Sequence, residues 1–192
     1  TQRPVNDDMR DTFAASFELV LYTITIVILF GVPLGVVAAR WKDRWPDNVV
    51  RIFALVSAVP PTFLLALLLQ VLAGYVLHAL PVTGRLPAGM PFSADTTGLV
   101  TIDALLRGRM DVFAEALRHL LLPCLALAST ALGQIALTTR ASMIDVASQD
   151  YMEASRAFGV PEPVRVMKYM LRPAFVPPLT ILGLSFAAMV GN

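Results

Sequence analysis

The sequence predicts an all-α polytopic membrane protein, from its composition and from four long runs without Asp, Glu, Lys or Arg. Of the 192 residues, 56% are apolar, compared with roughly 45–50% in soluble domains. The uncharged runs cover residues 19–39, 52–84, 119–139 and 173–192. Because about 20 mostly apolar residues cross a hydrocarbon core about 30 Å thick, we expect four transmembrane helices.

The two ends of the chain carry no sign of a natural start or stop. The chain begins at Thr1 rather than at a methionine, and it stops at Asn192 within the last apolar run. We therefore expect residues 1–192 to be a single transmembrane domain that is truncated at both ends. The first apolar run is too long for a signal peptide, and the NDDMRD flank before it is acidic.

The basic residues gather in two connections between the apolar runs. Nine of the fifteen lysines and arginines lie there: Arg40, Lys42, Arg44 and Arg51 after the first run, and Arg140, Arg156, Arg165, Lys168 and Arg172 after the third. Basic residues near the ends of membrane helices favour the cytoplasmic side. We therefore expect residues 40–51 and 140–172 to be cytoplasmic, and residues 81–118 and the N-terminus to be external.

The first two runs each contain residues that shape a helix. Gly31 and Gly35 lie four apart in the first run, a spacing that allows a neighbouring helix to approach closely. Pro60 and Pro61 lie about a third of the way into the second run and interrupt its backbone hydrogen bonds. We expect a kinked or broken helix there, which is a candidate pathway-lining kink or hinge.

The external segment, residues 81–118, is predicted to be a turn-rich loop followed by an amphipathic helix. Its first part is rich in glycine and proline, and DALLRGRMDVFAEALRHLL then alternates apolar and charged residues at helical spacing. We expect an interfacial helix or a lid. The third run follows, with Ser129 and Gly133 as a second pair of small residues four apart.

The cytoplasmic segment, residues 140–172, is predicted to form two amphipathic helices joined by a sharp elbow. Gly159 followed by Pro161 is a typical helix stop, because glycine allows a left-handed turn and proline cannot continue the helix. Glu162 near the start of the second helix, and Lys168 and Arg172 near its end, match the helix dipole.

Several kinds of chemistry are absent from the sequence. Neither of the two lysines, Lys42 and Lys168, follows a glycine, so the chain has no phosphate-binding loop of the Gly-Lys-Ser/Thr type. No H-E-x-x-H or G-x-S-x-G motif occurs, and Cys124 is the one cysteine. No charged residue lies in the middle of an apolar run, which disfavours a carrier driven by protons or sodium ions. We predict neither an enzyme nor a metal or nucleic-acid site.

A family resemblance rests on the cytoplasmic segment. Glu153, Ala154 and Ser155 followed by Gly159 resemble the EAA loop in the membrane subunits of bacterial ABC importers. The longer string TTRASMIDVASQDYMEASRAFGV resembles the dipeptide, oligopeptide and nickel permease branch. The usual motif continues to an I-x-L-P string, whereas this chain has YMLRP at that place.

This resemblance implies a function and a set of partners. It implies a six-helix permease of the bacterial inner membrane, paired with a homologous or identical second permease. Two ATPase subunits would bind ATP and magnesium, and an external solute-binding protein would deliver the cargo. The residues expected to dock an ATPase are Tyr151, Glu153, Ala154, Ser155, Phe158 and Gly159. Dipeptides, longer peptides and chelated nickel all remain open as cargo, and a secondary carrier or a membrane scaffold is the alternative class.

Overall fold

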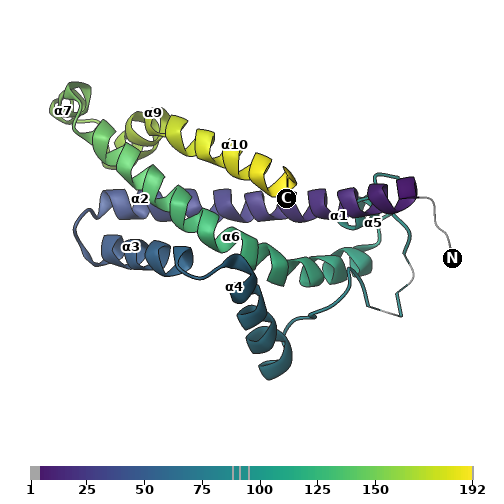
Figure 1. Cartoon of the computed structure of the whole chain (residues 1–192). Helices are drawn as coiled ribbons and strands as arrows, with labels where there is room; N and C mark the ends of the chain where they lie inside the picture. The colour runs from purple at the N-terminus through teal and green to yellow at the C-terminus, as the bar shows by residue number, and fades with distance from the viewer. Residues whose placement is uncertain (1–4, 88, 91, 95, 192) are drawn as a thin grey trace. The chain divides into compact units, whose positions relative to one another are not determined.

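A computed structural model describes residues 5–87, 89–90, 92–94 and 96–191, and every regular element in these ranges is a helix (Figure 1). Two helical stretches are continuous and apolar enough to cross a membrane, Thr12–Arg40 and Met110–Ala147. Two further stretches, Trp45–Val76 and Glu162–Val190, meet the same criterion as interrupted pairs of helices. The four predicted spans therefore correspond to two continuous helices and two broken ones.

The first continuous stretch combines α1 (Val5–Ile26), a π-helical segment η1 (Val27–Gly31) and α2 (Val32–Arg40). The second is α6 (Met110–Ala147). The broken pairs are α3 (Trp45–Ala58) with α4 (Thr62–Leu69) and η2 (Gln70–Val76), and a helix over residues 162–174 with α10 (Val176–Gly191). The latter pair bends by 52° at its break.

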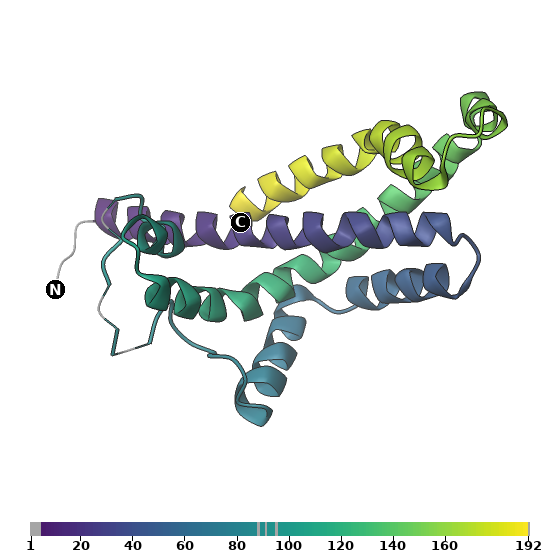
Figure 2. The same cartoon turned by 180° about the vertical axis from the view of Figure 1, so that it is seen from behind.

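The predicted break at the two prolines is confirmed. α3 ends at Ala58 and α4 begins at Thr62, and a short coil between them is visible from both sides in Figures 1 and 2. Pro61 has φ −56° and ψ 141°, an extended conformation outside the helical region. Its carbonyl accepts hydrogen bonds from the amides of Leu64 and Leu65 and so starts the next helix. The use of this break as a pathway kink stays a prediction.

The chain divides into two compact units. The first contains residues 1–23 and 61–127, including α5 (Val100–Leu106) and the start of α6. Its small core consists of Val100 and Ala104 from α5 packed with Val112 and Ala116 from α6. This core fixes α5 against the beginning of α6.

The single amphipathic helix expected in the external segment is wrong, because the structure divides it at Gly108. This glycine has φ +67°. The amide of Arg109 donates to the carbonyl of Ala104 at 2.8 Å, and the amide of Gly108 donates to Leu105 at 3.1 Å. These two bonds form the glycine-terminated helix cap that ends α5 before α6 begins.

In the second unit, residues 24–60 and 128–192, small residues bring three helices together. A Cβ added at Gly35 of α2 would lie 2.7 Å from the carbonyl oxygen of Ala136 on α6. A Cβ added at Gly133 of α6 would lie 2.8 Å from the Cα of Ala54 on α3. The predicted close approaches at Gly35 and Gly133 are therefore confirmed, and both hold α6 against its neighbours.

Candidate functional site

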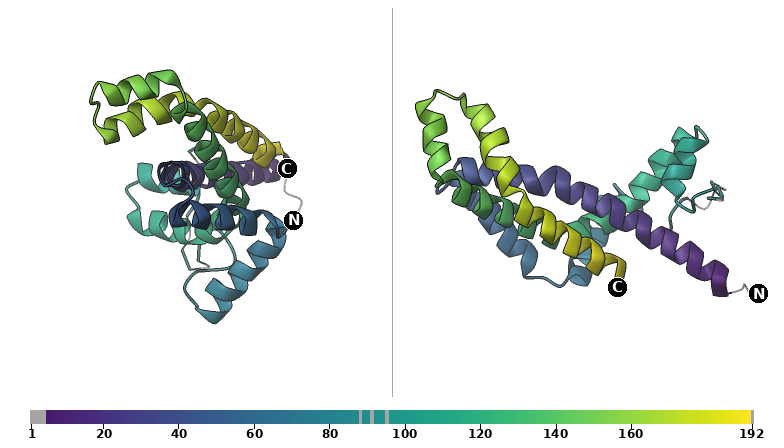
Figure 3. Two further views of the ribbon diagram at one scale, coloured as in Figure 1. Left: turned by 90° about the vertical axis from the view of Figure 1, so that its left-hand side faces the viewer. Right: turned by 90° about the horizontal axis from the view of Figure 1, so that it is seen from above.

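The predicted elbow is present in the second unit. α6 ends at Ala147, and α7 (Asp150–Ala157) follows after two residues. After a turn, the chain continues as a second helix. This helix consists of α8 (Glu162–Val164), the π-helical segment η3 (Arg165–Leu171) and α9 (Arg172–Ala174). Figure 3 shows α7 and this helix side by side at the end of α6.

Gly159 ends α7 as the sequence predicted. It has φ +69°. Its amide donates to the carbonyl of Arg156 at 3.0 Å, and the amide of Val160 donates to Ser155 at 3.1 Å, which together form the same kind of glycine cap as at Gly108. A residue with a Cβ would pay about 1–2 kcal/mol for this left-handed conformation. The elbow is thus a constrained turn.

One face of α7 packs on the chain itself. Met152 is fully buried and Ser155 is 7% exposed. Met152 belongs to an apolar cluster with Met143 of α6 and Val166 and Met170 of η3. The hydroxyl of Ser155 donates to the carbonyl of Met152 at 2.7 Å. This cluster attaches the elbow to the end of α6.

The opposite face of α7 is exposed. Phe158 is 86% and Tyr151 is 44% exposed, and Glu153 and Ala154 are also exposed. Of the six residues expected to dock a partner, Ser155 is therefore the exception, because it points inward. It follows Met152 by three residues, so the two side chains share one helical face. A motif gives spacing but not which face is covered, so docking by Ser155 stays a prediction.

A buried ion pair that the sequence did not predict joins α6 to α3. Arg140 donates from Nε to Oδ1 of Asp47 at 2.5 Å and from Nη2 to Oδ2 at 2.7 Å. The side chain of Asp47 is fully buried. Its Oδ2 also accepts the amide of Asp43 at 2.9 Å. The sequence suggested only that Arg140 is a cytoplasmic cation.

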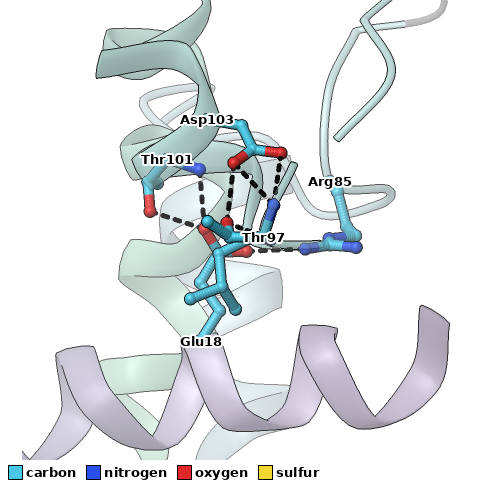
Figure 4. A network of polar contacts seen from close by, with 6 residues as sticks. Glu18, Arg85, Thr97, Thr101 and Asp103 are labelled. Atoms are coloured by element: carbon cyan, nitrogen blue, oxygen red, sulfur yellow. Dashed lines mark hydrogen bonds and ion pairs between the residues drawn. The ribbon is translucent and has the colours of Figure 1, made fainter. Parts of the chain in front are cut away.

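A second unpredicted network lies in the first unit, shown in Figure 4. Glu18 of α1 is 2% exposed. Its Oε1 accepts the amide of Thr101 at 2.7 Å and the hydroxyl of Thr101 at 2.5 Å. Its Oε2 accepts Nη2 of Arg85 at 2.6 Å. Since Thr101 lies in the first turn of α5, Glu18 satisfies a helix N-terminal amide that has no partner within the helix.

Asp103 forms the other half of the network in Figure 4 and folds the preceding loop onto α5. Its carboxylate accepts the amides of Thr96 and Thr97 and the hydroxyl of Thr97. Burial disfavours the charged form, but these hydrogen bonds outweigh it, so the pKa of Asp103 lies below its usual value. Its contribution to stability is present above the unfolded pKa of about 3.9 and is lost as the pH falls through the lower folded value.

A pocket of 240 Å³ lies beside Glu18 and Arg85, and His119 also lines it. The two charged groups are already paired with each other. Within the described ranges, no group of three or more His, Cys, Asp or Glu residues could hold a metal ion.

Comparison with known proteins agrees with the resemblance found in the motif. The model of the family "Binding-protein-dependent transport system inner membrane component" matches residues 31–192. The "Probable D,D-dipeptide transport system permease protein DdpB" of Escherichia coli K12 is 39% identical over 190 residues, covering 99% of this chain and 56% of that relative.

Two further relatives are named for peptide-like cargo. The "Dipeptide transport system permease protein DppB" of Alkalihalophilus pseudofirmus is 34% identical over 192 residues, covering all of this chain and 57% of that protein. The "Glutathione transport system permease protein GsiC" of Escherichia coli K12 is 31% identical over 192 residues, covering all of this chain and 53% of that protein. The chain thus spans about half the length of these curated relatives. Because the family model covers most of the chain, the protein belongs to the family of binding-protein-dependent transport system inner membrane components, as a multi-pass protein of the bacterial inner membrane.

Proposed function

We propose that the chain is part of the membrane-spanning permease subunit of an ATP-driven ABC importer for peptides. Family membership supports a transport role, and the three relatives are named for dipeptide, D,D-dipeptide and glutathione transport. These names favour peptides over chelated nickel as cargo. A secondary carrier and a scaffold lose their support, because the relatives are permeases of transport systems.

The proposal includes the partners that this chemistry requires. The sequence has no phosphate-binding loop, so ATP and magnesium would be bound by two separate ATPase subunits. A second permease would complete the pathway, and an external binding protein would deliver the peptide. The chain's own contribution is a set of membrane helices and an exposed elbow.

The exposed face of α7 is the observation that carries this proposal. A helix laid into a groove of another subunit transmits movement, and such contacts use large apolar anchors. Phe158, at 86% exposure, is a large aromatic residue that this chain leaves uncovered at the end of α7. Tyr151, seven residues earlier, is 44% exposed, and its hydroxyl donates to the carbonyl of Tyr169 at 3.3 Å. We infer that an ATPase covers Tyr151, Glu153, Ala154 and Phe158, with Gly159 shaping the turn.

The substitution Ala154→Arg tests this docking. It places a long charged side chain in the centre of the proposed contact without touching the buried Met152 face, so we expect the ATPase to be lost from the detergent-purified transporter. Uptake of radiolabelled D-alanyl-D-alanine and glutathione into proteoliposomes should fall to background. The measurements are ATPase co-purification and ATP-dependent uptake.

The matched control is Ala114→Arg, which adds the same charge at an exposed alanine of α6 in the first unit, 33 residues before α6 ends. This variant should keep both the ATPase and uptake. If Ala154→Arg also retains the ATPase and transports at the wild-type rate, α7 is not the docking surface.

A further inference from the structure

The ion pair between Asp47 and Arg140 holds its two side chains in one geometry. Both carboxylate oxygens of Asp47 accept hydrogen bonds from the guanidinium of Arg140, which is 16% exposed. Such a pair recovers much of its desolvation cost through attraction, and apolar residues of similar size often stabilise a protein as well or better. Stability alone therefore does not account for a charged pair at this position. Its two-pronged geometry is suited to fixing the register of α3 against α6.

The same carboxylate also fixes the turn that joins α2 to α3. Asp43, in this turn, has φ +60°, which is uncommon for a residue other than glycine. Its amide donates to Oδ2 of Asp47, the oxygen that also accepts Nη2 of Arg140. Arg51 places a second cation nearby, with its Nε 3.7 Å from Oδ1 of Asp47. One carboxylate thus sets both the conformation of the turn and the position of α6.

Arg140 lies close to the elbow along a rigid element. It is seven residues before α6 ends at Ala147, and Met143, in the next turn of α6, is buried in the cluster that holds α7 and η3. Thr139, the residue before Arg140, packs on Gly35 of α2. A Cβ added at Gly35 would lie 2.5 Å from the Cβ of Thr139. Close packing and the ion pair therefore form a continuous series of contacts from the elbow to the turn between α2 and α3.

We propose that Asp47 and Arg140 are positioning residues that pass a displacement of the elbow to α2 and α3. This inference rests on the proposed function, in which an ATPase moves the elbow. When α7 moves, α6 moves with it, and the ion pair carries the turn at Asp43 and the start of α3 along. Without the pair, the elbow still binds the ATPase, but ATP hydrolysis is no longer converted fully into movement of the membrane helices.

The test compares transport with ATP hydrolysis in the complete transporter reconstituted in proteoliposomes. Asp47→Asn alone leaves Arg140 without its counter-charge, so the main variant is the double substitution Asp47→Leu with Arg140→Met, which leaves no buried charge unpaired. We expect this variant to retain the ATPase subunit and to hydrolyse ATP. The number of D-alanyl-D-alanine or glutathione molecules imported per ATP should fall about tenfold, within the 5–150-fold range typical of coupling between sites.

The matched control removes a different ion pair in the same unit. Arg40 and Glu162 lie 3.1 Å apart, and their side chains are 42% and 51% exposed. Exposed pairs contribute little, so Arg40→Gln with Glu162→Gln should leave the ratio of uptake to hydrolysis unchanged.

Two results would overturn the inference. The first is a wild-type ratio in the apolar double variant, and the second is loss of the ATPase from it, which would make the pair purely structural. Failure of the proposed function would look different, since the unsubstituted protein would then carry no ATPase at all.

Discussion

Glu18→Ala is expected to be the most damaging substitution in the first unit. It removes the acceptor of two buried donors, the amide and the hydroxyl of Thr101, and the partner of Arg85. Leaving a buried hydrogen-bond donor without its acceptor typically costs about 1–3 kcal/mol. The N-terminus of α5 would lose its attachment to α1. We expect a lower unfolding temperature of the purified protein in detergent and faster tryptic cleavage at Arg107 and Arg109.

Glu18→Gln is the matched control, because an amide oxygen can still accept from Thr101. It loses the attraction to Arg85, whose side chain is 39% exposed. Ion pairs exposed to solvent contribute about 1 kcal/mol or less to the free energy of unfolding. The glutamine variant should therefore lie much closer to the wild type than the alanine variant. Equal unfolding temperatures for Glu18→Ala and the wild type would contradict the role given to this carboxylate.

Gly35→Ala is expected to have the second large effect. The added Cβ would lie 2.5 Å from the Cβ of Thr139 and 2.7 Å from the carbonyl oxygen of Ala136, neither of which can rotate away. α2 and α6 must therefore separate, and such overpacking costs about 1–3 kcal/mol. This cost opposes the gain of about 1 kcal/mol that alanine brings over glycine within a helix.

Gly183→Ala separates these two effects, because no described atom lies within 4 Å of the Cβ it would add to α10. Its thermal unfolding midpoint in detergent should stay level or rise, whereas that of Gly35→Ala should fall. A rise in both variants would mean that α2 and α6 do not pack as closely as described.

Features set by local sequence were the ones that could be predicted. The helix break follows from the missing amides of Pro60 and Pro61, and the end of α7 follows from Gly159. The lengths of the apolar runs were enough to predict the membrane-spanning segments. These predictions succeeded because each depends on backbone geometry or on hydrophobic length, which act within a few residues of the chain.

Features that depend on distant partners could not be predicted. Asp47 and Arg140 are 93 positions apart, and Glu18 and Thr101 are 83 positions apart. Nothing in the local sequence of an aspartate near a helix start tells which cation will reach it. The burial of Ser155 could not be predicted for a related reason, since the side of α7 that is covered depends on η3. The π-helical segments η1 and η3 were also missed, although each lies just before a proline, Pro33 or Pro173, whose missing amide disturbs the helical ladder.

Site-specific crosslinking from the elbow tests whether an exposed face of α7 docks a separate ATPase. Phe158→Cys and Ser155→Cys, each in a Cys124→Ala background, place a thiol on the exposed end and on the buried face of the same helix. With a short bifunctional thiol-reactive reagent in native membranes, Phe158→Cys should form a covalent adduct that contains an ATPase subunit, and Ser155→Cys should form little or none. The absence of an ATPase adduct from Phe158→Cys, or equal adducts from both positions, would contradict the account.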